Sequence, residues 1–351
     1  MYGRGLSGLY TCLTTRPAAK VHYLVYFYDV ENLREQILIL ISSPLYLIII
    51  GVEIFLSNYH HRRPAPLHDS RGHKTYTWRD TLTNIYLMVL NGIIDLSFRT
   101  VYLVILTSCY KHRWISITNV FSYWLLLLLA EDFVYYWLHR WDHEIRVFWA
   151  VHVTHHSSQH MNFTVGFRSS VFQPLYRFIY FIPLTLLGFR PLDIILMYSA
   201  TQIWGIFVHT ELIGKLGWLE YILVTPSHHR VHHASNAKYL DRNMGMFLII
   251  WDQLFGTFQP ELPVEDYEPL RYGLTKPLED PGPAGVVFHE WQAIGKDLSR
   301  RDIGWKEKWQ YLVGPPGWSH DGSRLTSDQL REAETTEYPD FATHASRAQT
   351  F

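Results

Sequence analysis

The chain has 351 residues and a formal net charge of −1 at pH 7. This near-neutral balance, without a basic stripe, argues against a nucleic-acid partner. Its two cysteines, Cys12 and Cys109, are too few for a disulfide framework or a thiolate metal site.

Apolar residues are concentrated in the first two thirds of the chain, after an N-terminal segment of mixed character. Arg4, Arg16 and Lys20 interrupt that first segment, so the sequence predicts no cleaved signal peptide. Beyond about Pro260 the chain becomes polar, charged and rich in proline and glycine. This division indicates a membrane part followed by a polar part.

Five segments are apolar enough to cross or enter a bilayer. Gln36–Ser57, Asn84–Cys109 and Ile115–Leu138 each reach the ~20 residues that a spanning helix needs. Val171–Gly188 and Pro191–Leu212 are interrupted or shorter, and they predict a hairpin that crosses one leaflet or the whole bilayer. We therefore expect an all-α integral membrane protein with about 4–5 transmembrane or hairpin helices. Core helices of a soluble protein are the alternative.

The charges predict the orientation of these spans. Five Lys or Arg residues lie between Ser57 and Asp80, which favours a cytoplasmic location for that loop. Two spans later the chain returns to the same side at 139–156, and the hairpin returns it again at 229–233. We expect a cytosol-facing, metal-binding cap on the endoplasmic reticulum of a eukaryote or on the inner membrane of a bacterium.

Histidines form a repeated pattern in this cap. The pattern reads His-x-x-x-His once and His-x-x-His-His twice. Positions three and four apart share one face of a helix, so each cluster presents its imidazoles in one direction. Imidazole binds iron, zinc, copper and nickel, and eight ligands suit two ions better than one. The predicted ligands are His139, His143, His152, His155, His156, His229, His232 and His233.

Further candidates lie close to these clusters. His209, near the end of a hydrophobic helix, is a possible ninth ligand, whereas His160 is predicted to be a neighbour. Glu144 directly follows His143 and is a candidate ligand, proton acceptor or exposed acid. Asp132 lies two helical turns before His139 and either accepts a hydrogen bond from its imidazole or pairs elsewhere. Asn236, Asp241 and Asn243 follow the third cluster and are candidates for hydrogen bonds to its imidazoles, whereas His228 is expected to point away from the metal and to lie around the ligands.

The ligand chemistry favours iron. Two irons held by neutral imidazoles near lipid can attack an unactivated C–H bond, whereas a thiolate-free site gives no preference for softer metals. Zinc binds the same ligands, so a zinc-dependent lipid hydrolase stays open as a less favoured reading. The chain has no HExxH motif and no paired-carboxylate bridge to support that reading.

These motifs resemble the fatty acid hydroxylase and sterol desaturase superfamily of integral-membrane di-iron oxygenases. The resemblance covers about Phe133 to Gln259 and is greatest to alkylglycerol monooxygenase-like members. The segments that carry it are Tyr135–Arg140 with His143-Glu144, His155–Ser158, His209–Glu211, Thr225–His233 and Ile250–Phe258.

The resemblance implies an enzyme that uses two iron ions, O2 and an external electron donor. That donor is either tetrahydrobiopterin or a protein of the cytochrome b5 or ferredoxin type. The eight histidines are implied to bind iron, and Glu144 is implied to matter for catalysis. The expected reaction is hydroxylation of a membrane lipid such as an alkylglycerol. The nearest alternative is a sterol or fatty-acyl desaturase or a C-4 methyl sterol oxidase.

The expected domain order follows the composition. Residues 1–35 form an N-terminal segment, 36–130 the transmembrane helices, 131–259 the histidine-box domain and 260–351 a polar tail. Val286–Trp309 predicts one or two amphipathic helices in that tail, and the last twenty residues are predicted to be disordered. A cap over the metal face and a passive surface segment are both open for the tail.

Overall fold

The computed structural model describes residues 17–60, 75–279 and 282–337. The chain divides into a unit of residues 1–45 and a unit of residues 46–351. The described residues form helices, turns and two isolated bridges, without a β-strand, which confirms the all-α expectation for them. The helices are α1 (Pro17–His60), α2 (Trp78–Tyr110), α3 (Val120–Glu144), α4 (Arg146–His156), α5 (Pro174–Leu186), α6 (Pro191–Phe207), α7 (Pro226–His232), α8 (Ile250–Phe255), α9 (Gly282–Leu298), α10 (Trp305–Val313) and α11 (Ser327–Glu337), with short 3-10 turns η1 (Val165–Phe167), η2 (Gly217–Tyr221) and η3 (Ala237–Tyr239).

Among the residues that the structure describes, two helices are long and apolar enough to cross a membrane. They are Gln36–Tyr59, within α1, and α2. The first contains the predicted span Gln36–Ser57, and α2 contains the predicted span Asn84–Cys109. Large apolar side chains are exposed along them, among them Leu47 at 74% and Leu96 at 71%. Apolar surface of this extent is typical of a face that meets lipid.

The other predicted spans are shorter or less apolar than expected. α3 begins five residues after Ile115, contains the adjacent acids Glu131 and Asp132, and continues to Glu144. α5 has 13 residues and α6 has 17, so each falls below the ~20 residues of a full span. They form the predicted hairpin, which turns at Gly188 (φ +97°), where a Cβ would collide with the Ile115 carbonyl.

Local sequence signals explain where these helices begin. The Thr77 side chain accepts the Asp80 N–H at 3.3 Å at the start of α2. Asn119 accepts the Ser122 N–H at 2.9 Å at the start of α3. Both are side chains that commonly satisfy the free N–H groups of a helix N-terminus. α5 and α6 each begin at a proline, which suits the first helical turn.

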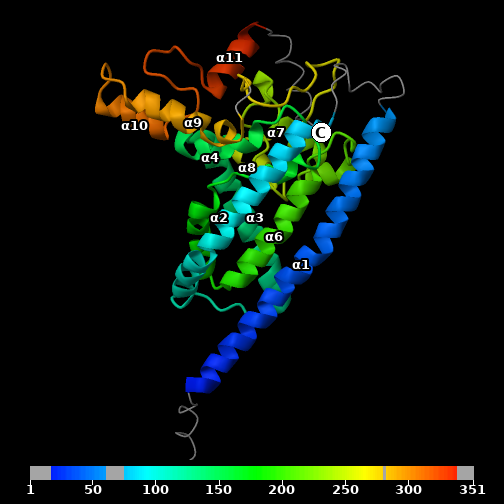
Figure 1. The fold of residues 1–351 in the computed structure, drawn as a ribbon, viewed down its shortest axis with the longest axis vertical. Coiled ribbons are helices and arrows are strands. Elements are labelled where there is room, and N and C mark those ends of the chain that lie inside the picture. The colour runs from blue at the N-terminus through cyan, green and yellow to red at the C-terminus, as the bar shows by residue number, and fades with distance from the viewer. Residues whose placement is uncertain (1–16, 61–74, 280–281, 338–351) are drawn as a thin grey trace, which may run out of the picture. The chain divides into compact units, whose positions relative to one another are not determined.

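The apolar core lies among α2, α3, α5 and α6, and Figure 1 shows α2, α3 and α6 side by side. Tyr102 and Leu106 of α2 pack there with Leu127 of α3. An ion pair of 2.9 Å between Asp95 and Arg177 also joins α2 to α5. The histidine-bearing ends of α3 and α6 therefore belong to one packed bundle.

A buried acid of α1 links this helix to the loops of the cap. Glu53 is fully buried and accepts hydrogen bonds from the Phe163 N–H at 2.9 Å and the Thr210 hydroxyl at 2.5 Å. The Tyr76 hydroxyl also donates to it. A buried carboxylate is stable only with such hydrogen-bond donors. Glu53 therefore holds the loop segments that contain Phe163 and Thr210 against α1. Thr210 directly follows His209.

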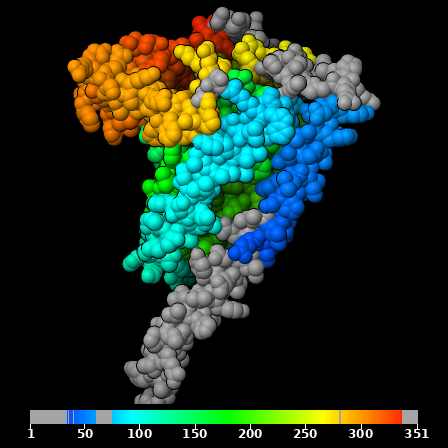
Figure 2. Space-filling view, viewed as in Figure 1, coloured from blue at the N-terminus to red at the C-terminus, as the bar shows by residue number. Residues whose placement is uncertain are grey.

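The polar tail packs against the histidine-bearing helices. Arg146, at the start of α4, is 2% exposed and pairs at 2.7 Å with both Glu290 and Asp297 of α9. In Figure 2 the orange and red tail segments gather at the upper end of the molecule. The two predicted amphipathic helices are present as α9 and α10.

The C-terminal end of the described chain is helical. The predicted disorder of the last twenty residues is wrong for residues 332–337, which belong to α11, because that helix packs on η3. Residues 338–351 lie outside the described residues. The prediction on a cleaved leader falls mostly on residues 1–16, which also lie outside them.

We expect Glu53→Ala to lower the thermal stability of the detergent-purified protein. The change leaves buried donors without an acceptor, and each unmade hydrogen bond costs ~1–3 kcal/mol. Glu53→Gln, which keeps one acceptor oxygen, should lose less. The control is Val52→Ala, because Val52 is 50% exposed. A melting temperature of Glu53→Ala equal to that of Val52→Ala would contradict this role of Glu53.

Candidate metal centre

The predicted ligands lie at the ends of four helices. α3 carries His139 and His143 on its last two turns, and α4 ends with the second cluster. The short helix α7 carries the third cluster, and His233 follows it directly. His209 comes two residues after the end of α6. Helix ends therefore bring all nine side chains into one region.

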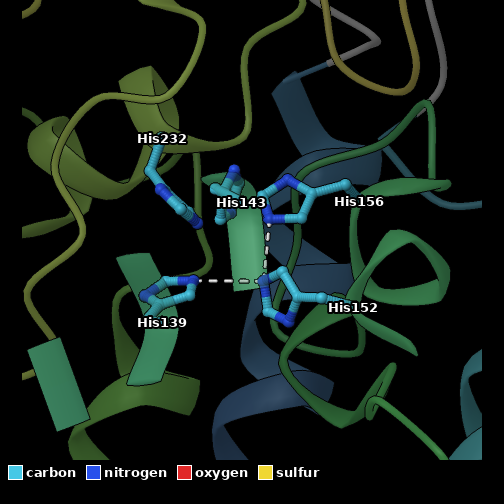
Figure 3. Close-up of side chains that lie close together, drawn as sticks. All are labelled: His139, His143, His152, His156 and His232. Carbon is cyan, nitrogen blue, oxygen red and sulfur yellow. Dashed lines mark hydrogen bonds between the residues drawn. The ribbon is translucent and has the colours of Figure 1, made fainter. Parts of the chain in front are cut away.

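The nine histidines divide into two groups, and within each group the potential ligand atoms all lie within 4.8 Å of one another. Figure 3 shows the imidazoles of the first group turned toward one another. The first histidine group contains His139, His143, His152, His156 and His232. The second histidine group contains His155, His209, His229 and His233.

Helical spacing explains this division. In α4, His152 and His156 are four apart and point to the first group, whereas His155 points to the second. The third cluster is divided in the opposite way. His229 of α7 and His233, which directly follows that helix, join the second group, whereas His232 joins the first. Each of these clusters therefore supplies both groups.

The nitrogen separations match those of ligands on a shared ion. In the first group, the Nε2 atoms of His139 and His156 each lie 3.1 Å from Nε2 of His152. In the second group, Nε2 of His209 lies 2.9 Å from that of His229 and 3.1 Å from that of His233. Two nitrogens at ~2.1 Å from one metal, at right angles, lie about 3 Å apart.

Backbone carbonyls fix the tautomers of four of these histidines. A carbonyl only accepts, so the Nδ1 facing it carries the hydrogen and Nε2 is left as a bare lone pair. His155 and His209 then direct two lone pairs at each other across 3.4 Å, which is repulsive unless a cation lies between them. The four Nδ1 contacts are His139 to Met244 O (2.8 Å), His155 to Arg168 O (2.9 Å), His209 to Gly205 O (2.6 Å) and His232 to Arg242 O (2.9 Å).

Two further observations fit a metal. The buried Nε2 atoms of His143 and His232 have no hydrogen-bond partner in the described part of the chain. Burial lowers the pKa of the imidazoles, to about 4 for His155, and keeps them in the neutral form that binds metals. The pKa is likewise lowered by burial for His139, His152, His156, His209, His229, His232 and His233.

Carboxylates lie beside two histidines of the first group. Asp241 Oδ1 lies 3.1 Å from His143 Nδ1, whereas the sequence predicted a hydrogen bond between Asp241 and an imidazole of the third cluster. Asp142 was not predicted; its Oδ2 lies 3.8 Å from Nδ1 of His152, which also contacts the Ser170 hydroxyl at 3.0 Å. Burial raises the pKa of Asp142 to about 7. Its position between two ligating histidines of α3 is the signal that could have identified it.

Other predicted partners hold the surrounding backbone instead. Asp132 accepts the N–H groups of Phe247 and Leu248, each at 3.0 Å, which corresponds to the alternative of pairing elsewhere. The His228 ring contacts Thr225 at the start of α7. Asn236 donates to the Pro269 carbonyl at 3.1 Å, and Asn243 donates to the His228 carbonyl at 3.0 Å. These residues act on the loops rather than on the imidazoles that they were expected to contact.

Glu144 and His160 lie outside both histidine groups. The Glu144 side chain is 43% exposed and pairs with Arg140 at 2.7 Å. His160 Nε2 lies 3.4 Å from the Thr77 hydroxyl. The structure does not bring either residue to the ligating nitrogens.

Residues 124–257, which contain both histidine groups, match the fatty acid hydroxylase family. This segment is similar to the fatty acid hydroxylase domain. Human alkylglycerol monooxygenase is 36% identical to the chain over 269 residues, which cover 74% of the chain and 58% of that relative. The domain therefore has relatives that match well beyond its own limits.

More distant relatives act on other lipids by name. The ornithine lipid hydroxylase OlsE of Rhizobium tropici is 33% identical over 153 residues, covering 43% of the chain and 46% of that protein. A Delta(7)-sterol 5(6)-desaturase of Gibberella zeae is 25% identical over 181 residues, covering 49% and 51%. The chain spans about half the length of the curated relatives that it matches. No solved structure matches it.

His209→Ala should remove metal from the second histidine group. Its Nε2 contacts three of the other nitrogens there, so no ligand of this group is better connected. We expect the metal content of the purified protein, by elemental analysis, to fall to about half that of the wild type, since one group of two is lost. His160→Ala is the matched control and should keep full content. Wild-type content in His209→Ala would remove this residue from the ligand set.

Proposed function

We propose that this protein is a membrane-embedded lipid monooxygenase that inserts one atom of O2 into a C–H bond. The observation that carries the proposal is the pair of buried histidine groups inside a fatty acid hydroxylase domain. Each group is proposed to hold one iron ion. The ligands are the eight histidines of the sequence pattern together with His209.

Iron bound in these groups would supply activation of O2 for attack on an unactivated C–H bond. The chain's own residues hold and orient the ligands. The carbonyls that accept from Nδ1 keep each Nε2 free and aimed inward, and the Asp241 carboxylate and the Ser170 hydroxyl orient His143 and His152. Insertion of one oxygen atom reduces the other to water, which requires two electrons from an external donor. We propose tetrahydrobiopterin or a cytochrome b5- or ferredoxin-type protein as that donor.

An alkylglycerol is the substrate that the similarities support best. Four of the relatives, from human, Xenopus tropicalis, Danio rerio and Caenorhabditis elegans, are named alkylglycerol monooxygenases and are 34–38% identical to the chain. Hydroxylation of the ether carbon would give a hemiacetal, which splits to an aldehyde and a glycerol. A sterol or fatty-acyl desaturase or a C-4 methyl sterol oxidase is the second candidate, because sterol desaturases are also similar to the chain.

We further propose a multi-pass topology of about 4–5 membrane segments, with the histidine groups facing the cytosol. The spans would be the apolar part of α1, α2, α3 and the α5–α6 hairpin. Exposed apolar residues at the start of α3, Val120 at 71% and Phe121 at 77%, support its contact with lipid. The proposed parts are an N-terminal segment (1–35), transmembrane helices (36–130), a histidine-box domain (131–259) and a polar tail (260–351). The proposed location is the endoplasmic reticulum or a bacterial inner membrane.

The test is metal analysis of the detergent-purified protein combined with O2 uptake in the presence of a reductant and an alkylglycerol. We expect about two irons per chain, since each histidine group fits one ion, and O2 uptake that depends on the lipid with release of an aldehyde. O2 uptake with a sterol but not with an alkylglycerol would favour the second candidate. Zinc with no O2 uptake would replace the oxygenase by a lipid hydrolase.

Glu144 is proposed to take part in catalysis rather than in metal binding, because it lies outside both groups. Glu144→Ala should keep the metal content and the helical fold but lose most of the lipid-dependent O2 uptake. Glu268→Ala is the control, because Glu268 is another exposed acid in an ion pair with an arginine. A wild-type rate for Glu144→Ala would show that Glu144 is a bystander.

A further inference from the structure

We propose that the C-terminal helix α11 positions Asp241 against His143, so that the first histidine group needs this helix to retain its metal. Arg331 and Ser327 are the positioning residues. The inference rests on the proposed metal binding, and it assigns a role to a segment outside the fatty acid hydroxylase domain, which ends at residue 257.

The segment from Leu240 to Met244 orients three of the five histidines of the first group. The Asp241 carboxylate contacts His143 Nδ1 at 3.1 Å. The Arg242 carbonyl lies 2.9 Å from Nδ1 of His232, and the Met244 carbonyl lies 2.8 Å from Nδ1 of His139. A shift of this segment would therefore turn several ligands at once.

The backbone of this segment is held in an unfavourable conformation. Asp241 and Asn243 have φ values of +52° and +55°, in the left-handed region that non-glycine residues seldom adopt. Asp and Asn tolerate this region better than most residues, but it still needs support from surrounding contacts. Each end of the segment is supported by a different part of the chain.

Residues that precede the tail support the end of the segment at Asn243 and Met244. The Asp252 carboxylate accepts the Met244 N–H at 2.6 Å and the Gly245 N–H at 2.8 Å. Asn243 exchanges hydrogen bonds with the backbone of Gln259 at 2.8 Å in both directions. These contacts do not involve the tail.

Helix α11 supports the earlier end. Arg331 Nη1 donates to the Leu240 carbonyl at 2.5 Å, and Asp328 pairs with the same guanidinium. Ser327, the first residue of α11, lies close to the Asp241 carboxylate. At the far end of the helix, Glu334 accepts the Tyr267 hydroxyl at 2.6 Å, which docks α11 on the loop after α8.

In the described hydrogen bonds, α11 does not contact the carbonyls that orient the second histidine group. His155 and His209 are oriented by the carbonyls of Arg168 and Gly205. Loss of α11 contacts should therefore affect one of the two proposed ions and spare the other. This asymmetry separates a positioning role from general destabilisation, which would release both ions.

The experiment measures release of ferrous iron from the full-length, detergent-purified protein to a chromogenic chelator. Wild type, Arg331→Ala, Ser327→Ala, Asp241→Asn and the double variant Arg331→Ala/Asp241→Asn are compared. Loss of a group that orients a metal ligand lowers metal affinity ~10–100-fold, so Asp241→Asn should release one ion at least about tenfold faster. Arg331→Ala should accelerate the same phase, and the double variant should match Asp241→Asn, because both changes act through one contact.

Two controls keep the outcome interpretable. Arg300→Ala removes an exposed tail ion pair with Asp302 and should leave both release phases unchanged. Arg331→Lys keeps a donor for the Leu240 carbonyl and should restore part of the retention, which also covers the case in which Arg331→Ala does not fold. Wild-type release from Arg331→Ala, equal loss of both ions, or additive effects in the double variant would each overturn the inference. A wild-type protein that holds no iron in the first group would instead overturn the proposed function beneath it.

Discussion

The metal centre depends on hydrogen bonds that lie outside it. Backbone carbonyl oxygens accept hydrogen bonds from Nδ1 of four histidines, so each Nε2 keeps an unshared lone pair aimed at its neighbours. These histidines are His139, His155, His209 and His232. Such a cluster of buried lone pairs is unfavourable by itself and becomes favourable around a cation. The loops that carry those carbonyls must therefore be held firmly, and much of the polar structure of the cap serves this purpose.

Buried acids provide most of that support. Asp132 holds the backbone of Phe247 and Leu248, Asp252 holds that of Met244 and Gly245, and Glu53 holds Phe163 and the residue after His209. Each carboxylate accepts several hydrogen bonds, which is the condition under which an acid is stable away from water. Acids within apolar helices thus contribute to the site through the backbone that they fix.

The two histidine groups are coupled by the helices that serve them both. Because α4 and α7 each place ligands in both groups, a rotation of either helix would disturb both proposed ions. Of the two groups, the first is the one proposed to depend on α11, through the segment that contains Asp241. The polar tail thus contacts the histidine-bearing part of the chain through α9 and α11.

The sequence by itself determined the helical class, two of the membrane segments and the eight patterned histidines, because periodicity and spacing are local properties. It also singled out Asp241 as a partner of an imidazole, but of the third cluster, whereas the structure places Asp241 beside His143. The tertiary structure decided how the histidines divide into two groups, that His209 completes the second, and that Asp142 rather than Asp132 lies beside a ligand. It also placed α11 on the loop before Met244. These contacts join residues distant in the chain, and their geometry follows from helix packing and loop conformation, which no local pattern encodes.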